Sequence, residues 1–328
     1  MSRVRRNYFM IAAASLAALS LPVLAQQPKM PVVGFLGIQS ASAFAERLSA
    51  FKQGLRETGY DEGRNVTVEY ISAEGHTDQF PRLAADLVRR QVDAIALTGL
   101  PAALAAKAAT TKIPIIFTGG FDPVAFKVVA SLNRPGGNIT GVTELGVSLA
   151  QKRLELMHEL IPAATALALL VNPANPNAEI TIAEVQAAAR TRGLRLHILR
   201  ANTEREIDIA FATLVQLRAG GLVIAAEPFL GSRTEQIAKL AIRHAVPTIL
   251  QFRNFVADGG LMSYGGDTIE QHRRVGIYTG RILKGDKPGD LPVQQTTKVE
   301  LIINLKTAKT LGIKIPQSIL LRADEVIE

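Results

Sequence analysis

Apolar runs and helical patterns alternate along the chain between residues 32 and 117. Short apolar runs, or segments that alternate between apolar and polar residues, indicate strands, whereas apolar residues that recur every three or four positions indicate helices. The expected strands are 32–36, 66–70, 94–97 and 113–117, and the expected helices are 44–55, 80–88 and 102–109. Because strands and helices alternate, we predict a parallel sheet with right-handed crossovers.

The same order of elements recurs after residue 166. Strands are expected at 166–171, 195–199, 222–225 and 246–252, and helices at 178–192 and 207–217. The match is clearest where Ile113-Pro114 and Val246-Pro247 each precede an apolar strand. This repeated order predicts two lobes of similar topology. One sequence leaves open whether the lobes arose by duplication or by convergence on a common pattern.

Three segments mix β-forming residues with glycine or polar residues, and they are candidates for connections between the lobes. They are 138–143, 261–264 and 296–303. If all three cross, each lobe is discontinuous and the helix expected at 271–284 returns to the first lobe. We therefore predict an α/β fold of two Rossmann-like lobes with parallel sheets, joined by a three-segment hinge. Lobe 1 comprises residues 30–141 plus 265–295, and lobe 2 comprises residues 142–264 plus 296–328.

The first residues have the pattern of a secretory leader. Three arginines precede an uncharged run at 8–25, and the small residues at its end, 23–25, are of the kind that a signal peptidase reads. We expect residues 1–25 to be a cleaved signal peptide. The alternative is a membrane anchor, which the two serines and the proline within the run disfavour.

Composition and charge exclude several classes of function. The chain has no cysteine, which excludes disulfides, thiol catalysis and a lipoprotein anchor. The formal charge of +8 includes the three leader arginines, so +5 remains on the rest of the chain, without a dense basic block. Nucleic-acid binding would favour a clustered basic face with interleaved aromatic residues, so we expect no nucleic-acid partner.

The titratable residues show no catalytic or metal-binding pattern. The five histidines are scattered, and neither a His-x-x-x-His spacing nor a carboxylate cluster at metal spacing is present. Ser40 lacks the context of a nucleophile elbow, and the glycines at 34–37 lack the third glycine of a dinucleotide-binding loop. We therefore expect no catalytic residues, no metal and no cofactor.

Seven motifs after the leader resemble those of a known family. They are FKQGLRE at 51–57, DPV at 122–124, RPGGNITG at 134–141, KRLEL at 152–156, NPANP at 172–176, GGLMSYG at 259–265 and IINLKTAK at 302–309. Together they resemble the substrate-binding proteins of bacterial ABC importers, in the family that includes tryptophan and tyrosine binders. The resemblance implies the type I periplasmic-binding fold and a non-catalytic, monomeric periplasmic receptor. Such a receptor captures a small molecule between its lobes, an amino acid or an aromatic compound, and docks on an ABC permease in the inner membrane.

Two positions depart from the family's usual sequence. Leu100 stands where the family usually has threonine in Gly-Thr-Pro-Ala-Ala, so a hydroxyl expected near a bound carboxylate is missing. Phe121 stands where the family usually has glycine, and its ring is expected to fill part of the crevice or to stack on a ligand. Both changes make the wall of the first lobe more apolar, which argues against assigning an amino acid as the ligand.

Ligand-binding residues are expected in the loops at the carboxyl ends of the parallel strands, because ligands bind there in open α/β sheets. Ser40 and Thr98 are candidates for contact with an anion, and Glu227 is a candidate to receive a cationic amine. The predicted set is Gln39, Ser40, Thr98, Gly99, Leu100, Phe121, Asp122, Asn172, Asn175, Glu227, Phe229, Phe252 and Tyr264.

Each polar or aromatic candidate also has a structural interpretation. Ser40 and Asp122 could cap the helices that follow them, and the asparagines of the 172–176 loop could hold a turn. Glu227 could be an exposed loop carboxylate, and the aromatic residues at strand ends could belong to the core.

Three other functions share parts of this pattern. A periplasmic sensor that is not coupled to transport would have the same residues. A sugar-responsive repressor core has a similar fold, but this chain begins with a leader and not with a DNA-binding helix pair. A secreted α/β enzyme is the third alternative.

Overall fold

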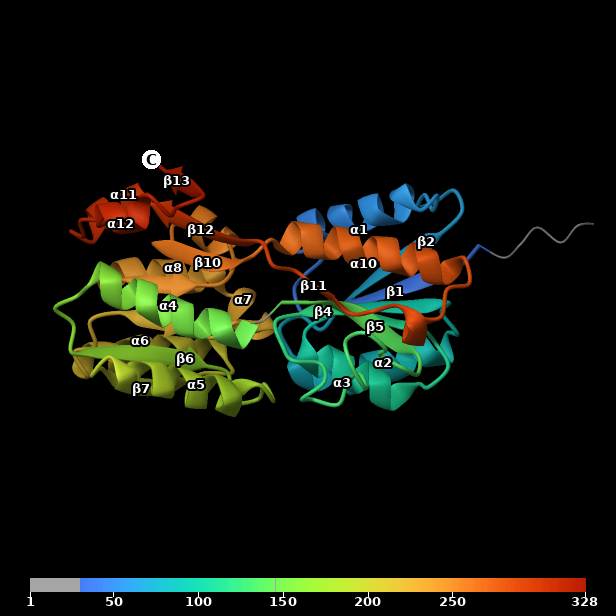
Figure 1. The fold of residues 1–328 in the computed structure, drawn as a ribbon, viewed down its shortest axis with the longest axis horizontal. Coiled ribbons are helices and arrows are strands. Elements are labelled where there is room, and N and C mark those ends of the chain that lie inside the picture. Colours follow the sequence, from blue (N-terminus) through green and yellow to red (C-terminus); the bar gives the residue numbers. More distant parts are fainter. Residues whose placement is uncertain (1–29, 145) are drawn as a thin grey trace, which may run out of the picture. The chain divides into compact units, whose positions relative to one another are not determined.

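Two β-sheets organise the part of the chain that this computed structural model describes, residues 30–144 and 146–328 (Figure 1). The predicted signal peptide, residues 1–25, lies outside the described residues. No helix among the described residues is both long enough and apolar enough to span a membrane.

The first sheet has six parallel strands in the order β11-β5-β4-β3-β1-β2. Its strands are β1 Val32–Gly37, β2 Thr67–Ser72, β3 Ala94–Thr98, β4 Ile115–Gly119, β5 Ile139–Thr143 and β11 Gln294–Gln295. Its helices are α1 Ala45–Glu57, α2 Phe80–Arg89, α3 Leu100–Ala109 and α10 Thr268–Leu283, with 3₁₀ turns at Thr77–Gln79 and Pro288–Asp290. Helices α1 and α10 lie side by side on one face of the sheet, and α2 and α3 cover the other (Figure 1). Buried residues of β1, β3 and β4 therefore meet helices on both faces.

The second sheet has seven strands in the order β13-β12-β10-β9-β8-β6-β7. Its strands are β6 Ala166–Val171, β7 Arg195–Arg200, β8 Leu222–Ile224, β9 Thr248–Leu250, β10 Met262–Gly266, β12 Val299–Asn304 and β13 Glu325–Ile327. Its helices are α4 Gly146–Leu160, α5 Ala178–Thr191, α6 Glu204–Gln216, α7 Pro228–Gly231, α8 Thr234–Arg243, α9 Asn254–Ala257, α11 Leu305–Thr310 and α12 Gln317–Leu320. The prediction of an α/β fold with two largely parallel sheets is confirmed.

One strand pair differs from the predicted parallel arrangement, because β10 and β12 are antiparallel. The reason lies in the connections. The chain leaves the second sheet after β10 to form α10 on the first sheet, and it re-enters the second sheet through β12. A strand that leads out and a neighbouring strand that leads back in run in opposite directions.

The chain passes between the sheets three times, from β5 to α4, from β10 to α10 and from β11 to β12. The first and third passages are hydrogen-bonded to each other, since the Thr296 amide donates to the Thr143 carbonyl over 2.9 Å. The lobe boundaries given above stay a prediction.

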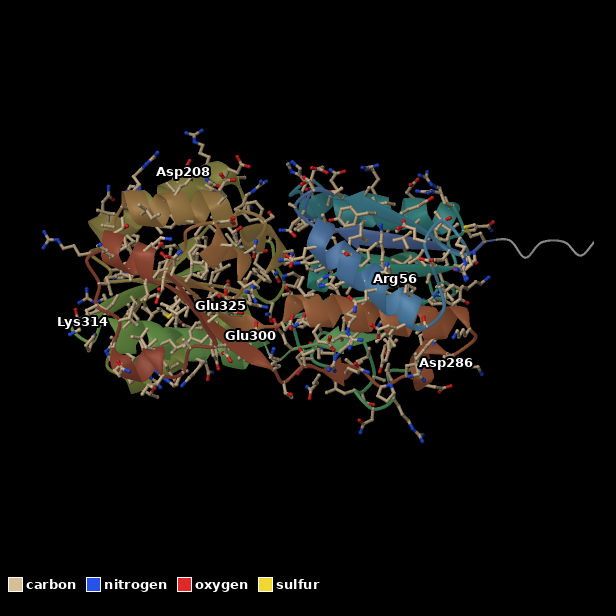
Figure 2. The ribbon with its side chains drawn as sticks, turned by 90° about the horizontal axis from the view of Figure 1, so that it is seen from above. Arg56, Asp208, Asp286, Glu300, Lys314 and Glu325 are labelled. Carbon is tan, nitrogen blue, oxygen red and sulfur yellow. The ribbon has the colours of Figure 1, made fainter. Side chains whose placement is uncertain are left out.

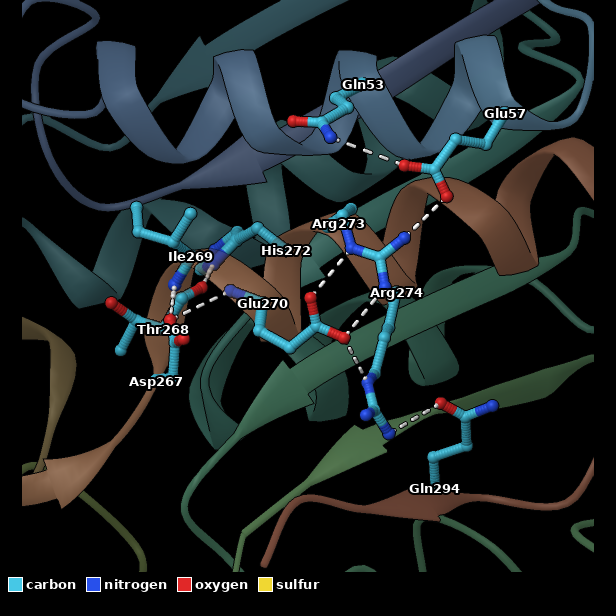
Figure 3. A network of polar contacts seen from close by, with 10 residues as sticks. All are labelled: Gln53, Glu57, Asp267, Thr268, Ile269, Glu270, His272, Arg273, Arg274 and Gln294. Carbon is cyan, nitrogen blue, oxygen red and sulfur yellow. Dashed lines mark hydrogen bonds and ion pairs between the residues drawn. The ribbon is translucent and has the colours of Figure 1, made fainter. Parts of the chain in front are cut away.

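Helices α1 and α10 approach closely because both carry glycine at their contact. A Cβ atom on Gly54 would overlap the carbonyl oxygen of Arg273, and one on Gly276 would overlap that of Phe51. Polar side chains bridge the same two helices, because Arg273 pairs with Glu57 of α1 as well as with Glu270 of its own helix (Figure 3). The N-terminal end of α10 is thereby fixed against the first lobe.

Candidate functional site

One cavity is lined by residues at the carboxyl ends of strands from both sheets, where ligands bind in open α/β folds. The space in it that the centres of water molecules can occupy is about 60 Å³. Roughly 10–15 Å³ of such space is needed to hold one water, so several waters fit. The lining residues are Ile38, Gln39, Phe44, Arg47, Thr98, Gly99, Leu100, Thr118, Gly119, Gly120, Phe121, Glu144, Asn175, Asn177, Ala226, Glu227, Pro228, Gly231, Gln251, Phe252, Thr268, Gln271 and His272.

Eight of the predicted ligand-binding residues line this cavity. They are Gln39, Thr98, Gly99, Leu100, Phe121, Asn175, Glu227 and Phe252. The other five, Ser40, Asp122, Asn172, Phe229 and Tyr264, are not among the lining residues.

Ser40 and Asp122 make local turn contacts instead. The Ser40 hydroxyl accepts a hydrogen bond from the Ala43 amide over 3.4 Å. The exposed Asp122 accepts from the amides of Val124 and Ala125 through one carboxylate oxygen, over 2.8 and 3.0 Å. No helix follows Asp122 before β5, and α1 begins at Ala45 with Phe44 as its N-cap and no side-chain cap, so the interpretation of Ser40 and Asp122 as helix caps is wrong and both side chains hold turns.

Asn172, Phe229 and Tyr264 make contacts with other parts of the protein instead of lining the cavity. The Asn172 amide donates to the Glu227 carboxylate over 3.1 Å, so it orients a lining residue. The buried Phe229 ring packs beneath the guanidinium of Arg233, 5.6 Å from the ring centre. Tyr264 packs against the core of the second lobe, which is the structural interpretation for an aromatic at a strand end.

Glu227 is a buried carboxylate on the second-lobe wall, with only 5% of its surface exposed, so the interpretation as an exposed loop residue is wrong. It caps α7 by accepting hydrogen bonds from the amides of Phe229 and Leu230. Burial raises the pKa of Glu227 to about 7, despite these donors and the amides of Asn172 and Asn175. Near neutral pH the group therefore exchanges readily between its charged and neutral forms.

His272 contacts Thr98 on the first-lobe wall, and the sequence analysis did not predict this contact. Its Nδ1 lies 2.5 Å from the Thr268 carbonyl, which can only accept, so Nδ1 carries the hydrogen (Figure 3). Nε2 is then an acceptor and takes the hydroxyl hydrogen of Thr98 over 3.3 Å. Burial, together with the positive charge of Arg47, lowers the pKa of His272 to about 3. Thr98 therefore has no hydrogen left to donate to an anion.

Glu144 is a second buried carboxylate that sequence reasoning missed, and it joins several elements at the hinge. It accepts hydrogen bonds from the Gln251 amide after β9, from the Gln271 amide of α10 and from the Gly266 amide at the end of β10. Burial raises its pKa, and the nearby Arg153 guanidinium opposes that rise. Glu144 therefore links both lobes beside the cavity.

Arg47 is the third lining residue that the sequence analysis did not single out. This half-buried residue of α1 donates to the Gln39 side-chain oxygen over 2.6 Å. Its guanidinium also lies 5.8 Å from the centre of the Phe44 ring and 5.4 Å from that of Phe252. Phe252 belongs to the second lobe, so Arg47 reaches across the cavity.

Two further contacts join the cavity walls. The Gln39 amide donates to the Gly231 carbonyl over 3.2 Å. Gly99 has a φ of +91°, which favours glycine, and a Cβ there would lie 2.5 Å from the Pro228 ring. The departure at Phe121 also has a defined place, because its ring packs 5.3 Å from that of Phe117 and fills part of the first-lobe wall.

The described residues contain no group of three histidine, cysteine, aspartate or glutamate side chains that could hold a metal ion. The polar groups of the cavity are instead single hydrogen-bonding side chains on apolar walls. This arrangement suits reversible binding of a small molecule.

Comparisons with known proteins agree with this geometry. Residues 32–327 match the family described as ABC transporter substrate binding protein. The tyrosine-binding protein of Clostridioides difficile strain R20291 is 28% identical over 264 residues, which cover 80% of this chain and 76% of that protein.

Two solved structures show the same fold. A conserved domain protein from Vibrio cholerae is 28% identical with a TM-score of 0.84, and the match covers 91% of this chain and all of that one. An ABC domain from Streptococcus pneumoniae, solved in complex with L-Trp, is 27% identical with a TM-score of 0.80 and coverage of 90% and 100%. Family membership implies an extracytoplasmic location and association with an ABC transporter. The chain belongs to the family of ABC transporter substrate-binding proteins, whose members bind their substrates and are not enzymes.

Proposed function

We propose that this protein is a periplasmic receptor that captures a small molecule, an amino acid or an aromatic compound, in the cavity between its lobes. The observation that carries the proposal is that strand ends of both sheets contribute to one cavity. The tyrosine-binding relative and the L-Trp complex support the ligand class. The rings of Phe44, Phe121 and Phe252 on the walls suit a flat apolar group.

Within this proposal, binding closes the lobes. Lobe 1 (30–141 plus 265–295) and lobe 2 (142–264 plus 296–328) rotate about the three passages between the sheets. A ligand drives this motion only if it contacts both lobes, because a molecule with equal affinity for both states shifts no equilibrium. The closed, monomeric receptor then docks on an ABC permease in the inner membrane.

The roles of the lining residues follow from their chemistry. Glu227 on the second-lobe wall receives a cationic amine, and Asn175 helps to hold its carboxylate. Gln39, Gly99 and Leu100 shape the first-lobe wall. Because Leu100 and Phe121 are apolar, they select for a compact ligand with an apolar body.

A thermal unfolding screen tests the proposed function. The protein without its leader is mixed with amino acids, aromatic carboxylates, aromatic amines and purines. A ligand at about 100 times its dissociation constant should stabilise the native state by about 2.7 kcal/mol. Ala226→Leu, which fills the cavity, should abolish the stabilisation, whereas Ala125→Leu on an exposed turn should not. No shift with any compound would count against the proposal.

A further inference from the structure

Arg47 is a cation on the cavity wall whose partners carry no charge. Among the described residues its guanidinium forms no ion pair: it donates to the Gln39 oxygen and lies near the rings of Phe44 and Phe252, and the charge of the neighbouring Glu46 acts on it only at longer range. Burial lowers the pKa of Arg47, which means that the charged form lacks full compensation within the protein. A guanidinium has five N–H groups, and the bond to Gln39 uses one of them.

The second-lobe wall offers acceptors where the first-lobe wall offers this donor. Gln251 lines the cavity with 5% of its surface exposed, and its Oε1 has no hydrogen-bond partner among the described residues. The amide orientation is fixed, because Nε2 of the same group donates to Glu144. Glu227 lies on the same wall. The two walls therefore differ in polarity, with an unpaired cation on one side and acceptors on the other.

Resting on the proposed function, we propose that Arg47 binds a carboxylate of the ligand and thereby determines specificity. The ligand then carries a carboxylate at its first-lobe end and a hydrogen-bond donor at its second-lobe end. The planar fork of a guanidinium matches a carboxylate, and stacking between Phe44 and Phe252 holds that fork in place before the ligand arrives. Arg47 supplies the hydrogen-bond donor that Leu100 lacks, while the Thr98 hydroxyl is engaged by His272.

The inference also assigns a structural role to the Arg47–Phe252 contact. Arg47 belongs to the first lobe and Phe252 to the second, and a carboxylate bound at the N–H edge of the guanidinium leaves the stacking on the ring in place. Bound anion and ring stacking then act together to hold the lobes in one arrangement. Compounds that lack the anion lose this contribution.

The test uses three compounds that share one ring system. L-Tryptophan has both a carboxylate and an amine, indole-3-propionate has only the carboxylate, and tryptamine has only the amine. Their affinities are measured by isothermal titration calorimetry with the wild-type protein, Arg47→Met, Arg47→Lys and Arg56→Met. Arg56→Met is the matched control, because Arg56 lies exposed on the same helix and its loss changes the net charge equally (Figure 2).

We expect the carboxylate compounds to bind and Arg47→Met to weaken them by about 10- to 100-fold, as for the loss of a hydrogen bond to a charged group. Arg47→Lys should recover part of the affinity, since it keeps the charge without the fork. Arg56→Met should bind like the wild type. The unfolding temperature of each ligand-free variant is measured alongside, and a variant that unfolds at assay temperature is replaced by Arg47→Gln.

The outcomes separate this inference from the proposed function. If tryptamine binds as well as the carboxylate compounds, or if Arg47→Met binds them like the wild type, the role of Arg47 is refuted and the receptor function stands. If none of the three compounds nor any other in the unfolding screen binds, the proposed function itself is contradicted, and the role of Arg47 falls with it.

Discussion

Glu227 and His272 line the same cavity but respond to pH in opposite ways. The pKa of Glu227 is raised from 4.5 to about 7, so the folded protein keeps a proton there that the unfolded chain has lost. The pKa of His272 is lowered from 6.5 to about 3, so the folded protein lacks a proton that the unfolded chain binds. Stability therefore falls with rising pH through Glu227 and with falling pH through His272. Between pH 4.5 and 6.5 the two effects offset each other.

Single substitutions should expose each effect. Relative to the wild type, Glu227→Gln should gain stability as the pH rises from 4.5 to 7, by up to about 1.4 kcal/mol per pH unit. His272→Gln should instead gain as the pH falls below 6.5, with a similar slope. Urea unfolding at half-unit pH steps measures both. Parallel curves for variant and wild type would contradict the assigned pKa shift, whatever the constant offset between them.

For single residues, a position at a strand end could be predicted from the sequence, whereas the groups that surround the residue there could not. Glu227 follows a strand and precedes a proline, which places it at a strand end. Its burial arises from contacts with the 172–176 loop, which is distant in sequence. The engagement of Thr98 by His272 joins residues 174 positions apart, and no local pattern encodes that distance.

The contact between α1 and α10 is the clearest feature at the scale of elements. Glycine in an exposed helix usually costs about 1 kcal/mol relative to alanine, so replacement would normally stabilise the helix. Here Gly54→Ala should have the reverse effect, because its methyl group overlaps the backbone of α10.

We expect Gly54→Ala to lower the free energy of unfolding by about 1–3 kcal/mol, as overpacking typically does. The exposed Ser49→Ala on the same helix is the control and should change stability by less than about 0.5 kcal/mol. Chemical denaturation measures both variants. A Gly54→Ala protein as stable as the wild type would show that the helices can separate without cost.

Strand positions could be predicted from the sequence, because buried strands and their following loops leave a local pattern. The strand expected at 166–171 is β6 without change of bounds, and 94–97 differs from β3 by one residue. Arg47 and His272 could not be found in this way. Both lie on helices whose periodicity shows a buried face. Periodicity does not show which elements that face contacts, and α10 packs on strands of the first sheet that are far away in the chain.

Glu144 connects the lobes at the scale of the whole molecule. It accepts bonds from Gln251, Gln271 and Gly266, which belong to different elements around the passages between the sheets. Near it, Arg153 is fully buried, and two of its nitrogens, Nε and Nη2, have no partner among the described residues. The carboxylate charge of Glu144 is thus part of what makes the burial of Arg153 tolerable.

Glu144→Gln should therefore destabilise the protein by about 1–3 kcal/mol, because a donor replaces an acceptor and Arg153 loses its nearby negative charge. Glu62→Gln, which breaks a surface ion pair with Lys52, is the comparison and should cost at most about 1 kcal/mol. Denaturant unfolding of both variants measures the difference. Equal losses would mean that the hinge does not depend on the charge of Glu144.

The three passages between the sheets also set the order in which the molecule can be built. The first sheet is completed by β11 and the second by β12 and β13, so neither is complete until residues beyond 293 have left the ribosome. Helix α10, which packs against α1, is synthesised late as well. Pairings between distant segments form slowly because the intervening chain must first be ordered. Both sheets of the nascent chain therefore stay incomplete for most of its synthesis. This delay leaves time for export machinery to capture the chain before it folds.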